Sequence, residues 1–183
     1  MDTEFVLVDK YDNIRNRTTL SSGVGISGAK TYFMKITPKR INLYTFFKLP
    51  LAWWGGVRVK ELSGNSCIVH IKHRWINQNP FRSMFWAAQG MAAEMTTGAL
   101  VRKKIDDSGR KVSMLVKNQR ASFFKKATGL IRFECHDGKD LAQTIERSAQ
   151  TGEGEIITMK SIGYNKDGVE VSSFDFGWSL RVK

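Results

Sequence analysis

The sequence predicts an α+β fold, in which a mostly antiparallel sheet of about six strands wraps around one long central helix. One observation behind this prediction is the stretch from Met84 to Met95. It is apolar on nearly every side of a helix, so we expect the sheet to cover it. The other observation is the order of elements along the 183 residues, which alternates single helices with pairs of strands.

The first predicted elements are a helix and a β-hairpin. Thr37 suits the N-cap of a helix with Pro38 in its first turn, and Pro50 is expected to end or kink this helix. Alternating apolar and polar residues then lie on both sides of the turn sequence Ser63-Gly64-Asn65. They predict two strands joined by a hairpin turn, at residues 57–62 and 67–73.

The long helix follows, and we expect it to run to about Val101. Two residues are candidates for the N-cap at its start. One is Asn79, which precedes Pro80, and the other is Ser83. A start at Ser83 would leave backbone amides free at the positive end of the helix dipole, where they would bind a carbonyl oxygen or an oxyanion. Those amides belong to Met84, Phe85 and Trp86.

The second half of the chain supplies four strands and a short helix. The last strand alternates most clearly, because Phe174, Phe176 and Trp178 face one way and the small or polar residues between them face the other. A helix of about three turns, with Leu141 on its apolar side, is expected to stop at Gly152. The four strands are expected at residues 112–124, 129–136, 155–162 and 169–182.

We predict two parts along the chain: residues 1–33 as an N-terminal extension of flexible-linker composition, and residues 34–183 as one domain. Residues 23–28 match the Gly-x-Gly-x-x-Gly spacing of a nucleotide-binding loop, but no long amphipathic helix follows directly, so we expect no such loop. The start of the chain lacks the features of a secretory signal, and no apolar run approaches the roughly 18 residues of a membrane span. We therefore expect a cytoplasmic protein without a transmembrane segment.

Charge is the most unusual feature of the composition. The 29 basic and 17 acidic residues give a net charge of +12, which either favours an anionic partner or serves solubility. Cys67 and Cys135 lack the spacing of zinc ligands, and we expect both to be core thiols. His70 and His73 lie three apart in a strand and so point to opposite faces. We therefore expect neither a metal site nor a cofactor.

Glu94 lies inside the apolar helix, where an unpaired carboxylate is costly and must meet donors or hold a proton. Helical spacing puts Ala87, Gly90, Met91 and Gly98 on its face. Three of these four side chains are very small, so they leave room for another molecule to approach the carboxylate. The structural alternative is that the small residues let the helix pack closely on the sheet, with Glu94 satisfied by structural donors.

Three segments stand out: Trp75-Ile76-Asn77-Gln78-Asn79-Pro80-Phe81-Arg82-Ser83-Met84, Met91-Ala92-Ala93-Glu94-Met95 and Phe123-Phe124-Lys125-Lys126-Ala127-Thr128-Gly129. Together they resemble the hotdog fold of acyl-CoA thioesterases, and within it an uncharacterised thioesterase-like branch known as a domain of unknown function. The resemblance covers roughly residues 34–183. It implies that Glu94, on the central helix, is the general base or nucleophile at a thioester carbonyl.

The same resemblance implies further site residues. Asn79 takes the place of a polar residue ahead of the helix, and a backbone amide near the helix start would polarise the carbonyl. Many of these thioesterases open the helix with His-Gly-Gly, whereas this chain has Phe85-Trp86-Ala87. Phe85 and Trp86 would therefore close or reshape the carbonyl pocket. Gln89 would contact the substrate or the facing protomer, or serve as a packing amide.

Basic residues and a second protomer complete the implied site. Arg120, Lys125 and Lys126 lie where the resemblance places the pocket mouth, so they would hold the phosphates of coenzyme A or simply form a solvated strand end. The resemblance also implies a homodimer or higher homo-oligomer, with sheets joined edge to edge and sites completed by both protomers.

Two functions of different classes stay open. The first is hydrolysis of an acyl-CoA or another acyl thioester. The second is a non-enzymatic protein that binds acyl chains or another apolar ligand, which the bulky Phe85-Trp86 pair favours. Nucleic-acid binding rests on the net charge alone and has no recognised motif, so we expect no specific nucleic-acid partner.

An aromatic group near the start of the predicted domain has two interpretations. Phe46, Phe47, Trp53 and Trp54, with Lys48 among them, would form an exposed patch that faces lipid. Alternatively, these side chains pack the first helix over the edge of the sheet.

Overall fold

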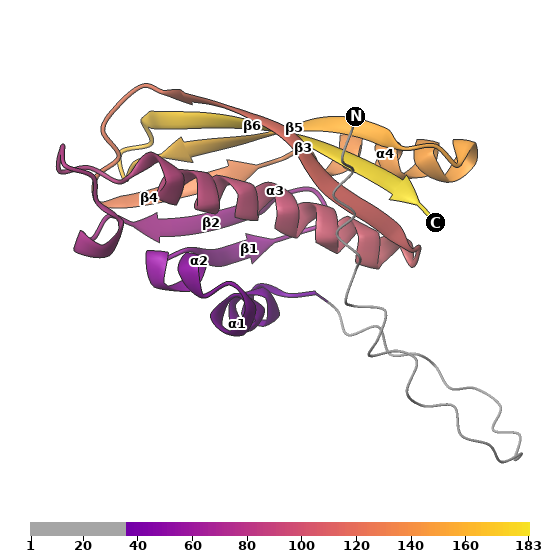
Figure 1. The fold of residues 1–183 in the computed structure, drawn as a ribbon, viewed down its shortest axis with the longest axis horizontal. Coiled ribbons are helices and arrows are strands. Elements are labelled where there is room, and N and C mark those ends of the chain that lie inside the picture. The colour runs from indigo at the N-terminus through magenta and orange to yellow at the C-terminus, as the bar shows by residue number, and fades with distance from the viewer. Residues whose placement is uncertain (1–35) are drawn as a thin grey trace, which may run out of the picture. The chain divides into compact units, whose positions relative to one another are not determined.

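The computed structural model describes residues 36–183, so the predicted extension at 1–33 and the glycine spacing at 23–28 lie outside the described residues. The observed order of elements agrees with the predicted order, and the α+β class is confirmed (Figure 1). The helices are α1 (Pro38–Lys48), α2 (Pro50–Gly55), the short 3-10 helix η1 (Trp75–Asn77), α3 (Trp86–Ser108) and α4 (Gly138–Thr151). The strands are β1 (Arg58–Leu62), β2 (Cys67–Lys72), β3 (Val112–Phe123), β4 (Leu130–Cys135), β5 (Glu155–Tyr164) and β6 (Glu170–Val182).

The six strands form one sheet in the order β1-β2-β4-β5-β6-β3, and every neighbouring pair is antiparallel. Helix α3 packs across one face, which we call the inner face, against β2, β4, β5 and β6 (Figure 1). The core lies between α3 and this face. In β6 it contains Phe174, Phe176, Trp178 and Leu180, the residues whose alternation predicted the strand.

Helices α1 and α2 pack at the β1 edge of the sheet. Asn42 of α1 pairs with the backbone of Val59 as a neighbouring strand would: its amide donates to the Val59 carbonyl at 2.8 Å and its oxygen accepts from the Val59 amide at 2.9 Å. This pair satisfies backbone groups that an edge strand would otherwise leave open. Pro50 separates the two helices as predicted, because α1 ends at Lys48 and α2 begins at Pro50.

Helix α4 lies against β5, β6 and α3, with Leu141 and Ile145 in the core. It ends at the predicted Gly152, which adopts the left-handed conformation with φ of 73° and donates its amide to the Ser148 carbonyl. Glycine adopts this conformation without the steric penalty that a side chain would bring. Within residues 36–183, no helix combines the length and the apolar character needed to cross a membrane.

Both cysteines are buried free thiols, as predicted, and they lie opposite each other on β2 and β4. Burial raises the pKa of Cys67 to about 12 and raises the pKa of Cys135 as well. At pH 8 a thiol with this pKa is ionised in roughly one molecule in ten thousand, and the thiolate is the reactive form. We therefore expect neither thiol to react with a disulfide reagent such as dithionitrobenzoate in the native protein, and both to react in denaturant. Rapid reaction of the native protein would contradict the burial of this pair.

Candidate active site

Helix α3 begins at Trp86 with Phe85 as its N-cap, so the two predicted starts, at Asn79-Pro80 and at Ser83, are both wrong. The backbone before Trp86 is extended because distant elements hold it. The Met84 amide donates to the Ala127 carbonyl and the Phe85 amide to the Asn77 carbonyl, both at 2.8 Å. Two of the three amides expected to be free are therefore engaged. The helix also runs seven residues past the predicted end at Val101, to Ser108.

The first turn of α3 still offers donors. Within residues 36–183, the amides of Trp86 and Ala87 have no acceptor. They lie at the positive end of a helix of 23 residues, which favours an anion or a polarised carbonyl oxygen. The rings of Phe85 and Trp86 are in contact, with centroids 5.8 Å apart, and both side chains are exposed beside these amides.

Asn79 organises the loop that leads to α3. Its side-chain oxygen accepts from the Phe81 amide at 3.0 Å and from the amide and hydroxyl of Ser83, both at 3.2 Å. Within the same loop, Arg82 has a left-handed backbone with φ of 57°. The acceptor oxygen of Asn79 is thus used by the loop itself, which shapes the approach to the start of α3.

Sequence reasoning did not single out Asn77, which is buried and holds this loop to two other elements. Its amide nitrogen donates to the carbonyls of Gly55 and Lys72, both at 2.9 Å, and its oxygen accepts from the Arg74 amide at 2.8 Å. Asn77 and Asn79 stand two positions apart in the sequence, and no local pattern distinguishes the asparagine that joins distant elements from the one that forms a loop.

Glu94 is exposed on α3, which corrects the expectation that this helix is covered on nearly every side. Even so, partial burial raises the pKa of the Glu94 carboxyl above its usual value. Within residues 36–183 its carboxylate has neither a hydrogen-bond donor nor an ion-pair partner; only its backbone carbonyl accepts, from the Thr97 hydroxyl. The side chain is therefore free to act on another molecule, although it lies in surroundings that disfavour its charge.

The glycines one turn before and one turn after Glu94 allow α3 to lie close to β6. A Cβ at Gly90 would lie 3.7 Å from the ring of Phe174, and a Cβ at Gly98 would lie 3.4 Å from the ring of Trp178. This is the close packing that the structural alternative predicted. Glu94 lies one helical turn from each of these glycines, and its partial burial there accounts for the raised pKa of its carboxyl.

An apolar strip borders this site. β3 is the edge strand next to β6, and its inward side chains are only partly covered. Trp178 pairs with Val116 and Phe174 with Ala121, so the strip follows the part of β6 that Gly90 and Gly98 approach. The half-buried residues on this strip are Val112, Met114, Val116 and Ala121.

Gln89 is buried and its amide is bonded at both ends. Its oxygen accepts from the Ser172 hydroxyl at 2.9 Å, and its nitrogen donates to the Met84 carbonyl at 3.2 Å. This geometry is that of the packing amide, one of the two alternatives for this residue. Together with the bond from Trp178 to Thr97 at 3.1 Å, it joins α3 to β6 by polar contacts inside the core.

We expect Ser172→Ala to lower the free energy of unfolding by about 1–3 kcal/mol, because the buried Gln89 oxygen would lose its donor. Urea denaturation would measure the change. Ser173→Ala is the matched control on the other face of β6, where the serine hydroxyl makes no such bond within residues 36–183, and it should change stability by less than about 0.5 kcal/mol. Equal losses for the two variants would contradict the importance of the Gln89 contact.

The predicted basic residues divide between two places. The loop that holds Lys125 and Lys126 runs beside the start of α3, and Lys126 reaches the Phe81 carbonyl at 3.5 Å. Arg120 lies elsewhere. In the register of β3 and β6 it is opposite Asp175, on the outer face of the sheet, which is the face away from α3. The structure thus brings Asn79, Phe85, Trp86, Lys125 and Lys126 together around the start of α3, with Glu94 two turns further along the helix.

A family model described as "Domain of unknown function (DUF4442)" matches residues 38–180. No curated protein is a detectable relative.

Solved structures share the fold at low sequence identity. A protein of unknown function from Pseudomonas aeruginosa, described as a probable thioesterase, superposes with a TM-score of 0.70 at 21% identity, over 80% of this chain and 97% of that chain. A protein of unknown function from Chlorobaculum tepidum gives a TM-score of 0.69 at 18% identity, over 81% and 99%. A mutant thioesterase from Pseudomonas aeruginosa gives 0.58 at 10% identity, over 81% and 96%.

These matches confirm the resemblance that the sequence suggested. The sheet wrapped on a long helix is the thioesterase-like hotdog fold, and at these identities the structures show the fold alone. The family match covers most of the chain, including the loop before α3, the helix itself and the segment that holds Lys125 and Lys126. The chain belongs to the DUF4442 family.

Proposed function

We propose that this protein hydrolyses an acyl thioester, with Glu94 as the residue that acts on the thioester carbonyl. The observation that carries this proposal is the state of Glu94. Its carboxyl has a raised pKa and no partner within residues 36–183, and it lies on α3 between glycines that approach β6, beside an apolar strip. Neighbours described as thioesterases are consistent with this chemistry, which their fold alone does not establish.

The carboxylate can act in one of two ways. As a general base it removes a proton from water, which attacks the carbonyl carbon, and collapse of the tetrahedral intermediate releases a carboxylic acid and the thiol. As a nucleophile it forms an anhydride with the acyl group and releases the thiolate; water then hydrolyses the anhydride to a carboxylic acid and the restored Glu94 carboxylate, and the proton freed in this step goes to the thiolate. Both routes require Glu94 to be ionised when the reaction starts, and both place negative charge on the carbonyl oxygen.

The position of the backbone amides that would donate to that oxygen leads us to propose a second protomer. The free amides at Trp86 and Ala87 lie seven or eight residues before Glu94, which corresponds to about 11–12 Å along a helix. One carbonyl group cannot contact both ends of such a span. We therefore propose a homodimer in which the α3 start of one protomer faces Glu94 of the other, and β3, with its half-covered strip, is the edge that lies nearest to the partner.

Basic residues beside the start of α3 suit a phosphorylated carrier such as coenzyme A. Lys125 and Lys126 are exposed there, and charge-assisted hydrogen bonds from lysine would hold phosphate groups. Arg120 lies on the outer face of the sheet, away from this loop, and is not included in the proposal. In this arrangement the acyl chain would lie along the apolar strip of β3.

The second candidate function is binding of an acyl chain without hydrolysis. The observation that favours it is the exposed Phe85–Trp86 pair at the helix start, which occupies space next to the amide donors. A thiol-release assay over short, long and aromatic acyl-CoA substrates separates the two functions. Turnover that Glu94→Gln removes supports hydrolysis, whereas saturable acyl-CoA binding without any thiol release supports the binding protein.

A further inference from the structure

The helical pair α1–α2 exposes an unusual number of large apolar side chains. In α1, Thr45 is the buried residue, and in α2 the buried residues are Ala52 and Gly55. We call the exposed group the aromatic surface. It comprises Leu43, Phe46, Phe47 (67% exposed), Leu51 (75% exposed) and Trp54 (66% exposed).

This exposure does not result from loose attachment, because the opposite side of both helices is held firmly. Asn42 bonds to the backbone of β1, and the guanidinium of Arg58 lies 3.4 Å from the centre of the Trp53 ring while donating to the Trp53 carbonyl at 2.9 Å. The Gly55 carbonyl at the end of α2 accepts from Asn77. The aromatic surface is therefore the outward side of two helices that are held in place by their other side.

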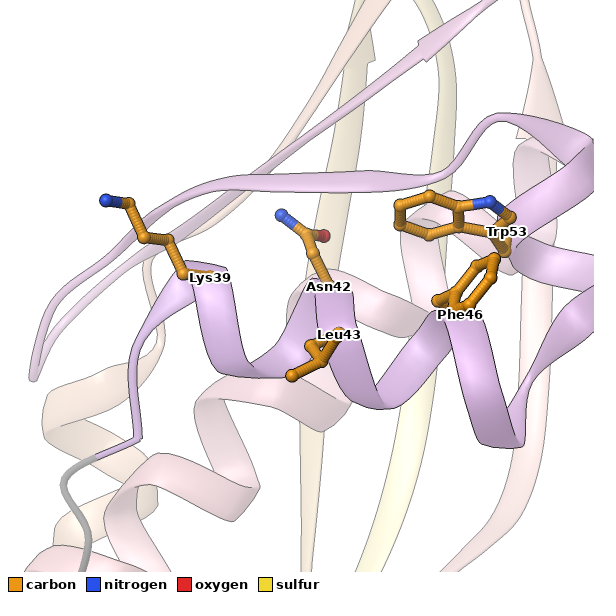
Figure 2. A pocket seen from close by; sticks show the side chains of 5 residues that line it. All are labelled: Lys39, Asn42, Leu43, Phe46 and Trp53. Atoms are coloured by element: carbon orange, nitrogen blue, oxygen red, sulfur yellow. The ribbon is translucent and has the colours of Figure 1, made fainter.

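A shallow hollow continues this surface. Its volume is about 450 Å³. Figure 2 shows Phe46 of α1 meeting Trp53 of α2, whose ring centroids are 5.1 Å apart, with Lys39 at the other end of the helix. Neither Glu94 nor any other predicted site residue lines this hollow. Its location and its apolar lining indicate a role separate from the thioester site.

The charge along the segment that forms these helices has a single sign. Residues 36–60 contain five Lys or Arg residues and no Asp or Glu. Lys39 and Lys48 are exposed at the two ends of α1, so they flank the apolar side chains between them. Aromatic and leucine side chains bordered by lysine are the composition of helices that lie in the interface of a membrane, where the apolar residues enter the acyl boundary and the basic residues meet anionic headgroups.

We propose that the aromatic surface of α1–α2 docks this protein on an anionic lipid bilayer. The docking is peripheral: α1 and α2 lie parallel to the bilayer surface, with Phe47, Leu51 and Trp54 inserted and Lys39 and Lys48 among the headgroups. The uniform basic charge favours a lipid surface over a second copy of this chain, because two such surfaces placed face to face would bring like charges together. The proposal is independent of whether the protein hydrolyses thioesters.

Vesicle sedimentation with the full chain tests this proposal. One vesicle preparation is pure phosphatidylcholine, and the other contains one part phosphatidylglycerol to two parts phosphatidylcholine. We expect binding to the anionic vesicles, with weaker binding when salt is raised from about 0.05 M to about 0.5 M because the ions screen the lysines. Equal binding to both preparations, or none to either, would overturn the proposal.

Two pairs of variants test the surface itself. Lys39→Glu/Lys48→Glu should weaken binding by at least about thirtyfold, because the loss of each basic residue near an anionic surface costs about fivefold and the two new carboxylates add repulsion. Its control is Lys72→Glu/Lys166→Glu, which changes the net charge equally at exposed sites outside α1 and α2. Leu51→Ser/Trp54→Ser should weaken binding at least about tenfold, and its control is Ile156→Ser, a 58% exposed residue of β5. Controls that weaken binding as much as the test variants would contradict the assignment to α1–α2.

Sedimentation equilibrium without lipid completes the test. The proposal expects Leu51→Ser/Trp54→Ser to keep the oligomeric state of the unmodified chain. If this variant dissociates instead, the aromatic surface is a contact between copies, and the proposal is wrong. All test positions are exposed, so the variants are expected to fold, and circular dichroism would verify this before the vesicles are used.

Discussion

Glu94→Gln is expected to lower kcat/KM for acyl-thioester hydrolysis by about a hundredfold to ten-thousandfold, the range attributed to a positioned acid or base. Glutamine keeps the size and hydrogen-bonding capacity of the side chain, but it can neither accept a proton from water nor form an anhydride. Because partial burial raises the pKa of Glu94, the acidic limb of the pH–rate profile should lie above the range of an ordinary glutamate. Thiol release measured across pH checks both statements.

A control on the same helix gives this experiment its specificity. Asp106→Asn removes a carboxylate of α3 that lies three turns beyond Glu94, and it should leave turnover unchanged. Full activity in Glu94→Gln would refute the assignment of Glu94. Equal loss in both variants would mean that negative charge on α3 matters in general and that Glu94 has no special position.

The same substitution has an expected effect on stability. The pKa of Glu94 is higher in the folded chain than in the unfolded chain, so between these two values the folded state binds more protons, and stability falls as pH rises. Above the folded pKa the ionised carboxylate destabilises the fold, and glutamine removes this penalty. The Tm of Glu94→Gln should therefore exceed that of the unmodified chain at pH 7, and the difference should disappear at pH values below the unfolded pKa. The opposite sign would show that Glu94 has donors in the folded protein.

Gly138→Ala is expected to destabilise the fold by about 1–3 kcal/mol, a range typical of steric overlap that surrounding structure must absorb. Gly138 is the first residue of α4, and its amide donates to the Asn65 carbonyl in the β1–β2 turn. A Cβ at this position would overlap the Asn65 Cα and would lie 2.5 Å from the Gly64 carbonyl oxygen. These contacts are with backbone, so no side-chain rotation relieves them. Urea denaturation would measure the loss.

Gly154→Ala serves as the matched control, because a Cβ there meets no atom of residues 36–183 within 4 Å and the residue precedes β5 in an open segment. We expect this variant to be neutral or slightly more stable, since alanine reduces the freedom of the unfolded chain. A Gly138→Ala variant as stable as Gly154→Ala would show that the hairpin turn moves away from α4 at little cost.

Local sequence patterns predicted most elements because the residues that determine these elements lie within them or next to them in the chain. Apolar residues at every second position predicted β6, and the left-handed conformation at Gly152 and the proline at position 50 ended their helices where expected. In contrast, the start of α3 depends on Ala127 and Asn77, which hold the Met84 and Phe85 amides in an extended backbone. Capping preferences of Asn79 and Ser83 could not reveal these partners, because both side chains are used within their own loop.

Which residues share a face was decided by tertiary structure. In β3 an extra residue between Val116 and Asn118 shifts the register, so even-numbered side chains point inward before it and outward after it. This bulge places Arg120 on the outer face, opposite Asp175, although an uninterrupted strand would have turned it toward α3. The alternation of residues along the strand does not reveal this change of register.

The sequence by itself determined the order of elements, the core alternation and the position of one carboxylate on an apolar helix, because each follows from neighbours in the chain. Only the tertiary structure decided that Glu94 is exposed and has no side-chain partner in the described part of the chain, while Gln89, on the same helix, is bonded at both ends inside the core. It also decided that the aromatic residues of α1–α2 remain on the surface, since Asn42 and Arg58 attach these helices by their other side. The physical reason is the same in these cases. Burial and hydrogen bonding depend on which distant segments pack together, and the spacing of residues along the chain does not specify that packing.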